Sequence, residues 1–377
     1  MIRSNPSKIK SIAQTIICAA SLFVLAPTAL AQSRADLPMS TTESISINSS
    51  QRTQIDEFIQ AWTGRALSDN APDTKKAIET LTNPLTQRGV SVAFRQAYSQ
   101  AITPLLNELD AKNTIGAKLA SLRIAGALAT PAAATRIKNA INDEDLGVQL
   151  FAVARAGYLF SATKAYGPAM TQTDAQSLIQ AIKALAQDLN INGELLRACV
   201  RTLSKGTQLS SKDMGETRSH AIIALTDIVG ARLRATKVTD DPSFAQGLAL
   251  ESASAITASI SDISSDTTPQ AVKAAVGLGG DIISIPLRRV VGGTIDPISD
   301  RDLTVRSVQA GETLLYFALR KDADLDHKFG KPVRQTHFAE QLRTGDDKTF
   351  RNQASLLLGP GSPIVEAFGF DDNRFLR

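Results

Sequence analysis

The sequence has few of the residues that support disulfide-rich or sheet-rich folds. Its 377 residues include two cysteines, three histidines and one tryptophan, and aromatic residues make up only 5% of the chain. Strands favour aromatic and β-branched residues. Here alanine and leucine carry much of the apolar content, and both favour helices. The composition therefore points away from a β-sheet core and toward close-packed helices.

A strong excess of one charge is also absent. The chain has 41 basic and 37 acidic side chains, a formal net charge of +4. Three of the basic residues (Arg3, Lys8 and Lys10) lie in an N-terminal stretch without acids, and subtracting those three from 41 leaves 38 against 37. A nucleic-acid-binding protein needs a concentrated basic face. The near-neutral balance argues against nucleic acid as a partner.

The N-terminus has the pattern of a secretory signal. A basic start is followed by the short apolar run TIICAASLFVLA at Thr15–Ala26 and by an Ala-x-Ala cleavage motif that ends at Ala31. The alternative is a membrane anchor, which needs about 20 apolar residues. Gln14 and Pro27 leave fewer than that. We expect residues 1–31 to be removed, leaving a periplasmic or extracellular chain without a stable membrane span.

Catalytic arrangements of cysteine and histidine are also missing. After signal cleavage Cys199 is the only cysteine, so no internal disulfide can form in an oxidising compartment. A nucleophilic thiol needs a partner base, and His220, His327 and His337 follow no recognisable catalytic spacing. We predict that Cys199 is a buried core thiol and that His220 is a partly covered helix residue.

Two short motifs invite a ligand-binding interpretation that their surroundings do not favour. Asp322, Asp324 and Asp326 open like a calcium loop, but the glycine and glutamate required at its sixth and twelfth positions are missing. VGLGGD at Val276–Asp281 looks like a phosphate loop, but it follows a helical pattern and lacks the lysine. We predict a solvated acidic turn and a glycine-capped helix end, with no metal or cofactor.

Helical periodicity begins after a serine- and threonine-rich stretch at 32–50, which predicts a flexible leader. The first apolar face holds Ile55, Phe58 and Ile59 at helical spacing. Short, alanine-rich helical patterns follow as far as residue 320, and only the segment 281–291 is ambiguous. Residues 321–377 are more polar and less regular, with two short helical patterns.

One seven-residue phrase occurs twice in the helical part. DEDLGVQ starts at Asp143, and DRDLTVR starts at Asp300, 157 residues later; both follow the pattern Asp-x-Asp-Leu-x-Val-[Gln/Arg]. At a helix start an aspartate can accept hydrogen bonds from the free N–H groups of the first turn, and its charge suits the helix dipole. We therefore expect Asp143 and Asp145, and likewise Asp300 and Asp302, to cap helices.

The phrase resembles the HEAT-repeat family, in which an Asp-rich turn leads into the second helix of each pair through a Val-Arg pair. Asp300, Asp302, Val305 and Arg306 match this pattern, whereas Gln149 replaces the arginine in the first copy. In that family the arginine commonly pairs with the turn aspartate of the adjacent repeat. The resemblance implies this role for Arg306. Such pairs form a ladder along the repeats, and at position 149 glutamine stands where the ladder would need an arginine.

A separation of 157 residues equals about four repeats at the usual period of roughly 40 to 47 residues. The resemblance implies an all-α fold: an α-solenoid of short antiparallel helix pairs over residues 51–320, followed by a polar, partly irregular C-terminal region over 321–377. A non-repeating all-helical domain is the alternative.

These features predict an exported, non-enzymatic helical-repeat protein that acts as a scaffold for a protein or peptide partner, because stacked helix pairs present an extended binding surface. We expect no catalytic residue. The alternative is a cell-envelope enzyme, or an accessory subunit of one, with a site in the 320–350 region formed by Asp322, Asp324, His327 and His337.

Overall fold

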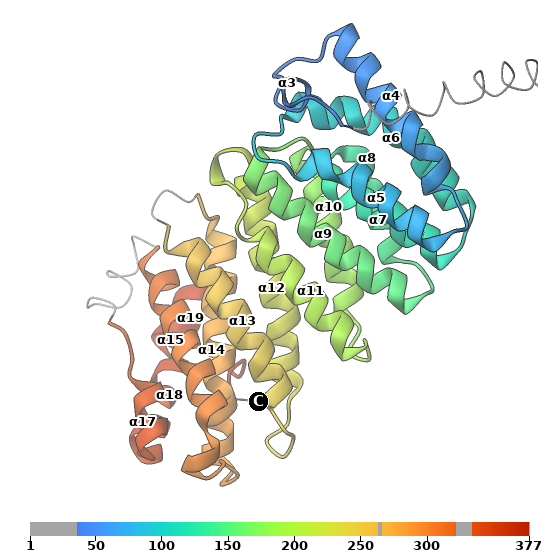
Figure 1. Cartoon of the computed structure of the whole chain (residues 1–377). Helices are drawn as coiled ribbons and strands as arrows, with labels where there is room; N and C mark the ends of the chain where they lie inside the picture. The colour runs from blue at the N-terminus through green and yellow to red at the C-terminus, as the bar shows by residue number, and fades with distance from the viewer. Residues whose placement is uncertain (1–35, 263–265, 322–333, 377) are drawn as a thin grey trace, which may run out of the picture. The chain divides into compact units, whose positions relative to one another are not determined.

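The computed structural model describes residues 36–262, 266–321 and 334–376, and every regular element in those ranges is a helix (Figure 1). The all-α fold that the composition predicted is therefore confirmed. The chain divides into two compact units, Met1–Ala120 and Ser121–Arg377. The predicted signal segment 1–31 and the acidic motif that begins at Asp322 lie outside the described residues.

The first unit contains four helices in its described part: α3 (Met39–Thr42), α4 (Ser49–Ala66), α5 (Ala71–Thr86) and α6 (Val92–Ala111). Helix α4 packs against α5 and α6. Its buried residues include Ile55, Phe58 and Ile59, which form the apolar face that the periodicity predicted. Helix α6 begins after Ser91, whose hydroxyl accepts a hydrogen bond from the Phe94 N–H at 3.0 Å.

Residues 36–50, the described part of the expected flexible leader, belong to the fold of this unit. Thr41 and Thr42 are buried. The Thr41 hydroxyl donates a hydrogen bond to Gln54 Oε1 at 2.7 Å, and the Ser91 N–H donates to the Thr42 carbonyl at 2.9 Å. Sequence composition predicted a flexible leader here, whereas these residues pack against the unit. Small polar side chains can fill buried positions when each hydroxyl finds a hydrogen-bond partner.

The second unit begins within α7 (Ile115–Leu128), and every regular element in its described part is a helix. Its further helices are α8 (Pro131–Ile141), α9 (Leu146–Tyr166), α10 (Gln172–Gln187), α11 (Gly193–Gly206), α12 (Ser211–Ala235), α13 (Ser243–Ile260), α14 (Pro269–Val291), the 3-10 helix η1 (Ile298–Asp300), α15 (Asp302–Arg320), α17 (Phe338–Thr344), α18 (Asp347–Leu358) and α19 (Pro363–Phe368).

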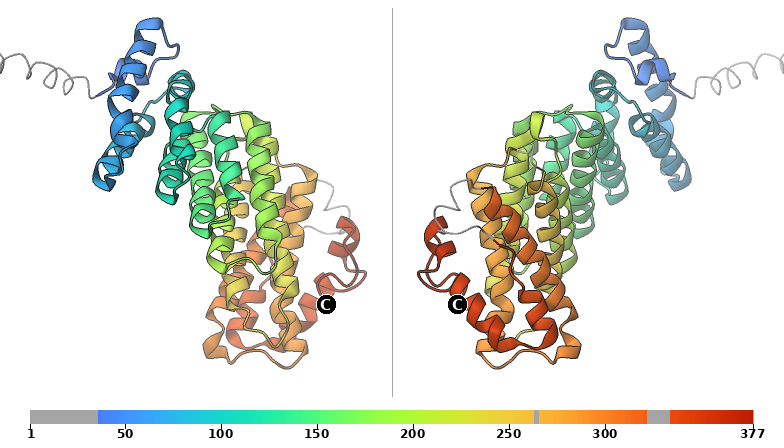
Figure 2. Two further views of the ribbon diagram at one scale, coloured as in Figure 1. Left: turned by 90° about the vertical axis from the view of Figure 1, so that its right-hand side faces the viewer. Right: turned by 90° about the vertical axis from the view of Figure 1, so that its left-hand side faces the viewer.

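The helices of the second unit alternate between two layers. Helices α8, α10, α12 and α14 contact one another in succession, and α18 continues this layer. Helices α9, α11, α13 and α15 form the other layer, which α17 continues. Each of these helices also contacts a sequence neighbour in the opposite layer, and Figure 2 shows them lying side by side. This arrangement is compatible with a helical repeat.

Several side chains donate hydrogen bonds to main-chain carbonyls of the preceding helix in the same layer, or of the loop that follows it. The Thr202 hydroxyl on α11 donates to the Val153 carbonyl on α9 at 2.8 Å. On the other layer, Arg232 donates to the Leu189 carbonyl at 2.6 Å, and Arg288 donates to the Leu233 carbonyl of α12 at 3.0 Å. The two arginines satisfy carbonyls at or just past the C-terminal ends of α10 and α12, where the helix itself supplies no partner, whereas the Val153 carbonyl lies in the interior of α9.

The motif Val276–Asp281 does not end a helix, so that prediction is wrong. It lies in the middle of α14, which continues through the ambiguous segment to Val291. The glycines instead allow close contacts: a Cβ at position 279 would lie 3.2 Å from the Gly311 carbonyl oxygen, and one at 280 would lie 2.5 Å from the Phe375 ring. Real Cβ atoms do not tolerate the second distance, so Gly280 makes room for an aromatic ring.

The described part of the polar C-terminal region, residues 334–376, belongs to the second unit. Two buried charged side chains, Glu312 and Arg301, attach it to the preceding helices. Glu312 on α15 accepts hydrogen bonds from the Phe338 and Ala339 N–H groups at 2.6 and 3.0 Å, at the start of α17. Arg301 forms a bidentate pair with Asp347, at 2.6 and 3.0 Å. Both contacts attach the last helices to α15 and η1.

Candidate functional site

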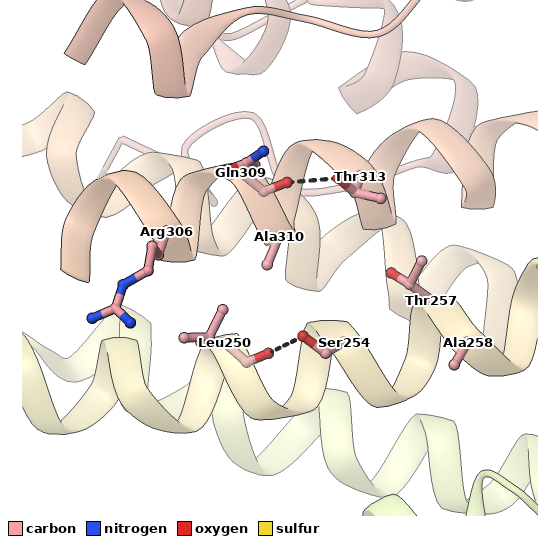
Figure 3. A pocket seen from close by; sticks show the side chains of 8 residues that line it. All are labelled: Leu250, Ser254, Thr257, Ala258, Arg306, Gln309, Ala310 and Thr313. Atoms are coloured by element: carbon pink, nitrogen blue, oxygen red, sulfur yellow. Dashed lines mark hydrogen bonds between the residues drawn. The ribbon is translucent and has the colours of Figure 1, made fainter. Parts of the chain in front are cut away.

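One candidate site lies on the exposed side of the layer formed by α9, α11, α13 and α15, which we call the odd-helix face. A groove of about 460 Å³ separates α13 from α15 on this face (Figure 3). It is lined by Leu250, Ser254, Thr257 and Ala258 of α13 and by Arg306, Gln309, Ala310 and Thr313 of α15.

Short side chains make the groove accessible, and its hydroxyl groups are mostly engaged. Ser254 donates to the Leu250 carbonyl and Thr313 to the Gln309 carbonyl, each at 2.8 Å and within its own helix (Figure 3). The buried Thr257 oxygen has no hydrogen-bond partner among the described residues. The groove therefore presents mainly alkyl surface, and its lining residues include no base that could activate a nucleophile.

Arg306 stands at one end of this groove (Figure 3). Its guanidinium pairs with Asp302 at 2.8 Å, one helical turn away on the same helix, and both side chains are more than half exposed. An exposed pair of this kind contributes little to stability. The partner of Arg306 is thus an aspartate of its own helix, and the arginine remains open to a ligand in the groove.

A row of cations continues the odd-helix face on α11. Arg197, Arg201 and Lys205 are all exposed and follow one another at four-residue intervals. Because a helix rises about 1.5 Å per residue, their attachment points lie about 6 Å apart along one line. Overall charge balance had concealed this local concentration, although the spacing itself was visible in the sequence.

Aromatic rings lie beneath these cations. Arg197 stacks over Phe244 at 5.1 Å and Lys205 over Tyr158 at 5.0 Å, and these rings are 39% and 52% exposed. Arg155 lies over Tyr158 at 4.3 Å. Exposed aromatic residues and arginines are enriched where proteins bind each other. The cations are thereby held against the surface instead of extending freely into water.

Two carboxylates interrupt the positive surface. Glu194 lies 3.4 Å from Arg197, and Glu251 lies 3.9 Å from Arg201. Burial raises the pKa of Glu251, while Arg201 and Arg197 act in the opposite direction. The odd-helix face therefore has a mixed, cation-rich character.

The two copies of the repeated phrase start their helices differently. Asp145 is the N-cap of α9, and its carboxylate accepts a hydrogen bond from the Val148 N–H at 2.9 Å. Asp143 in turn accepts from the Asp145 N–H at 3.0 Å. In the second copy Asp300 ends η1, and Asp302 is already the first residue of α15. The N-cap there is Arg301, without a side-chain hydrogen bond.

Cys199 is fully buried, as predicted, and carries no accessible chemistry. Burial raises the pKa of its thiol to about 12. The nucleophilic form of a cysteine is the thiolate, so this side chain stays protonated and inert near neutral pH.

The histidines are not brought together by the described structure. His220 is half-buried on α12, where its Nδ1 lies 2.8 Å from the Glu216 carbonyl, and His337 is exposed just before α17. Asp322, Asp324 and His327 lie outside the described residues. The enzyme alternative based on that region therefore stays a prediction.

Within the described ranges, no three His, Cys, Asp or Glu side chains are grouped so that they could hold a metal ion. In the same ranges, no helix has the length and apolarity needed to cross a membrane. No protein-family model matches the chain, and no curated protein is significantly similar to it.

Proposed function

We propose that this chain is an exported, non-enzymatic scaffold for protein or peptide partners, and that its second unit is an α-solenoid of the HEAT type. In such solenoids each helix pair contacts the pairs before and after it, and the stack presents an extended binding surface. The layer-by-layer succession of α8 to α15 supports this proposal.

The sequence separation of the links between repeats gives further support. HEAT repeats recur at roughly 40 to 47 residues. Four side-chain links join positions that are 39, 44, 47 and 46 residues apart, namely Lys138 with Ser177, Lys183 with Asp227, Arg234 with Asp281, and Arg301 with Asp347. A recurrent offset of this size is expected if equivalent positions of successive repeats face each other.

The odd-helix face is the proposed docking surface, and its composition is the observation that supports the proposed function. It combines a groove, exposed aromatic rings and a straight row of cations. A protein segment with carboxylate and apolar side chains would complement it. A nucleic acid is a poorer match, because Glu194 and Glu251 would repel its phosphates. The signal-like N-terminus supports export to the periplasm or beyond.

The test compares two charge-reversed variants of the chain without residues 1–31. Arg197→Glu with Arg201→Glu alters the odd-helix face. Lys75→Glu with Lys76→Glu makes the same charge change on exposed residues of α5. Each protein is used for affinity capture from an envelope extract, followed by quantitative mass spectrometry. We expect wild type and the α5 variant to capture at least one protein in similar amounts. The amount of that protein captured by the odd-helix face variant should be at least tenfold lower.

Thermal unfolding followed by circular dichroism checks that both variants are folded. Equal capture by the two variants would rule out the odd-helix face as the docking surface. A hydrolase activity of the wild-type protein that disappears with His337→Ala would overturn the non-enzymatic proposal itself.

A further inference from the structure

A second cavity, of about 340 Å³, lies on the opposite layer, between α12, α14 and the C-terminal segment (residues 369–376). Its lining is unusually rich in charge for its size. Arg234 of α12, Lys273 of α14 and Arg374 of the C-terminal segment all reach it, and the Phe370 ring forms part of its wall. Three cations from three separate segments thus meet at one cavity.

A buried carboxylate fixes two of these cations. Asp281 is fully buried and pairs with both Arg234 and Arg374. Arg374 is held by two hydrogen bonds, from Nε at 3.2 Å and from Nη2 at 2.8 Å. A guanidinium has five N–H donors in a rigid plane, so each arginine keeps donors that Asp281 does not use.

Two helical glycines provide the space for this arrangement. A Cβ at position 230 would lie 2.8 Å from Asp281 Oδ2, and one at position 277 would lie 2.7 Å from the Arg374 guanidinium. Glycine inside a helix costs about 1 kcal/mol relative to alanine. The arginines are therefore set in a defined place before any ligand arrives, which lowers the entropy lost on binding.

The third cation has no ion-pair partner among the residues that the structure describes. Lys273 is exposed and lies over the Phe370 ring at 5.6 Å, and it makes no ion pair with the described residues. Asp227, the carboxylate that lines the cavity, is already paired with Lys183 at 2.5 Å. The cavity thus keeps an excess of positive charge beside an aromatic wall.

We propose that this cavity binds a small organic anion. Its phosphate or carboxylate group would lie between the Lys273 ammonium and the unused N–H donors of Arg234 and Arg374, and its apolar part would contact Phe370. Arginine favours planar, two-point recognition of such oxyanions. A volume of 340 Å³ is at the lower end of the roughly 300 to 1,000 Å³ typical of ligand pockets, which limits the ligand to a small molecule.

Isothermal titration calorimetry with phenyl phosphate, benzoate, inorganic phosphate and sodium chloride, at constant ionic strength, tests the proposal. Phenyl phosphate or benzoate should bind more tightly than inorganic phosphate, because only they reach Phe370. If phenyl phosphate binds more tightly than benzoate, the ligand group is a phosphate; the reverse order indicates a carboxylate. Lys273→Ala should weaken binding about tenfold, since it removes one charge-assisted contact.

Lys348→Ala is the matched control, because Lys348 is also an exposed lysine of the same unit but lies outside both this cavity and the odd-helix face. It should bind the probes as wild type does. Partner capture by the odd-helix face is measured separately, so failure of this site and failure of the scaffold function are distinguishable. Equal affinity of Lys273→Ala and wild type, equal weakening by Lys348→Ala, or no binding by any probe below about 10 mM would each overturn the proposal.

Discussion

At the scale of single residues, Gly280 has the strictest steric requirement in α14. Its missing side chain leaves room for the buried Phe375 ring, which a Cβ would meet at 2.5 Å. We expect Gly280→Ala to lower the free energy of unfolding by about 1–3 kcal/mol through overpacking. Gly247 on α13 is the control, because no atom lies within 4 Å of a Cβ placed there.

Gly247→Ala should raise the free energy of unfolding by about 0.5–1 kcal/mol through helix propensity alone. Urea unfolding of both variants measures the difference. A stabilisation by Gly280→Ala would mean that Phe375 does not occupy the space beside α14 in solution.

Cys199 offers a residue-level test of burial and pH. With a pKa of about 12, about one thiol in 10⁴ is ionised at pH 8. In the chain without residues 1–31, we expect alkylation by iodoacetamide to proceed only as fast as the protein opens, and rapidly in urea. Fast alkylation of the native protein would contradict the buried position.

The raised pKa of the Cys199 thiol also affects the stability of the protein at high pH. The folded chain retains the Cys199 proton where the unfolded chain has lost it, near its ordinary value of about 8.5. Its contribution to stability is therefore complete below that pH and is lost as the pH rises toward about 12. Unfolding measured from pH 8 to 11 should show a smaller loss for Cys199→Ala than for wild type.

At the scale of helices, the repeated phrase separates two roles that look alike in the sequence. Asp145 accepts a hydrogen bond from the first turn of α9, whereas Asp302 only pairs with exposed Arg306. Asp145→Ala should cost about 1 kcal/mol of stability, and Asp302→Ala less than about 0.5 kcal/mol. Thermal unfolding of the two variants provides the measurement, and equal losses would show that Asp302 also caps its helix.

The sequence predicted most helices, because an apolar stripe at helical spacing is a local property. The burial of Cys199 and the capping role of Asp145 were also predicted correctly, because both were inferred from their local sequence. The glycines of α14 were misread because glycine is favoured both at helix ends and at close contacts. Distinguishing these uses requires knowing that Gly311 and Phe375 lie against that helix, and such contacts are far apart in the sequence.

The odd-helix face was missed for a different reason. Net charge averages over the chain, so the row of Arg197, Arg201 and Lys205 disappeared into a near-neutral total. Their four-residue spacing indicates a shared helix face, but exposure and the rings beneath them depend on how α11 packs against α9 and α13.

At the scale of the second unit, Arg301 attaches the last helices to the stack. It is 6% exposed and bonds Asp347, the Leu342 carbonyl and the Asp296 carbonyl. Arg301→Ala should leave these buried groups unpaired. We expect amide hydrogen exchange in α17 and α18 to accelerate about 100-fold, with little change in α9, because each helix of this unit contacts mainly its neighbours in the two layers.

Arg306→Ala is the control for this experiment, since Arg306 pairs only with an exposed aspartate of its own helix. It should leave exchange in α17 and α18 unaltered. Equal acceleration in α9 and α18 after Arg301→Ala would show instead that the whole unit opens as one.

Thr202, Arg232 and Arg288 reach across to the preceding helix of their layer and donate hydrogen bonds to its carbonyl oxygens. Every amino acid supplies a carbonyl, so the receiving position is free to mutate while the donor is not. Sequences can therefore differ at these receiving positions and keep the contacts, provided that the donors persist. Distant homologues are best sought through those donors and their spacing, because overall identity fades first.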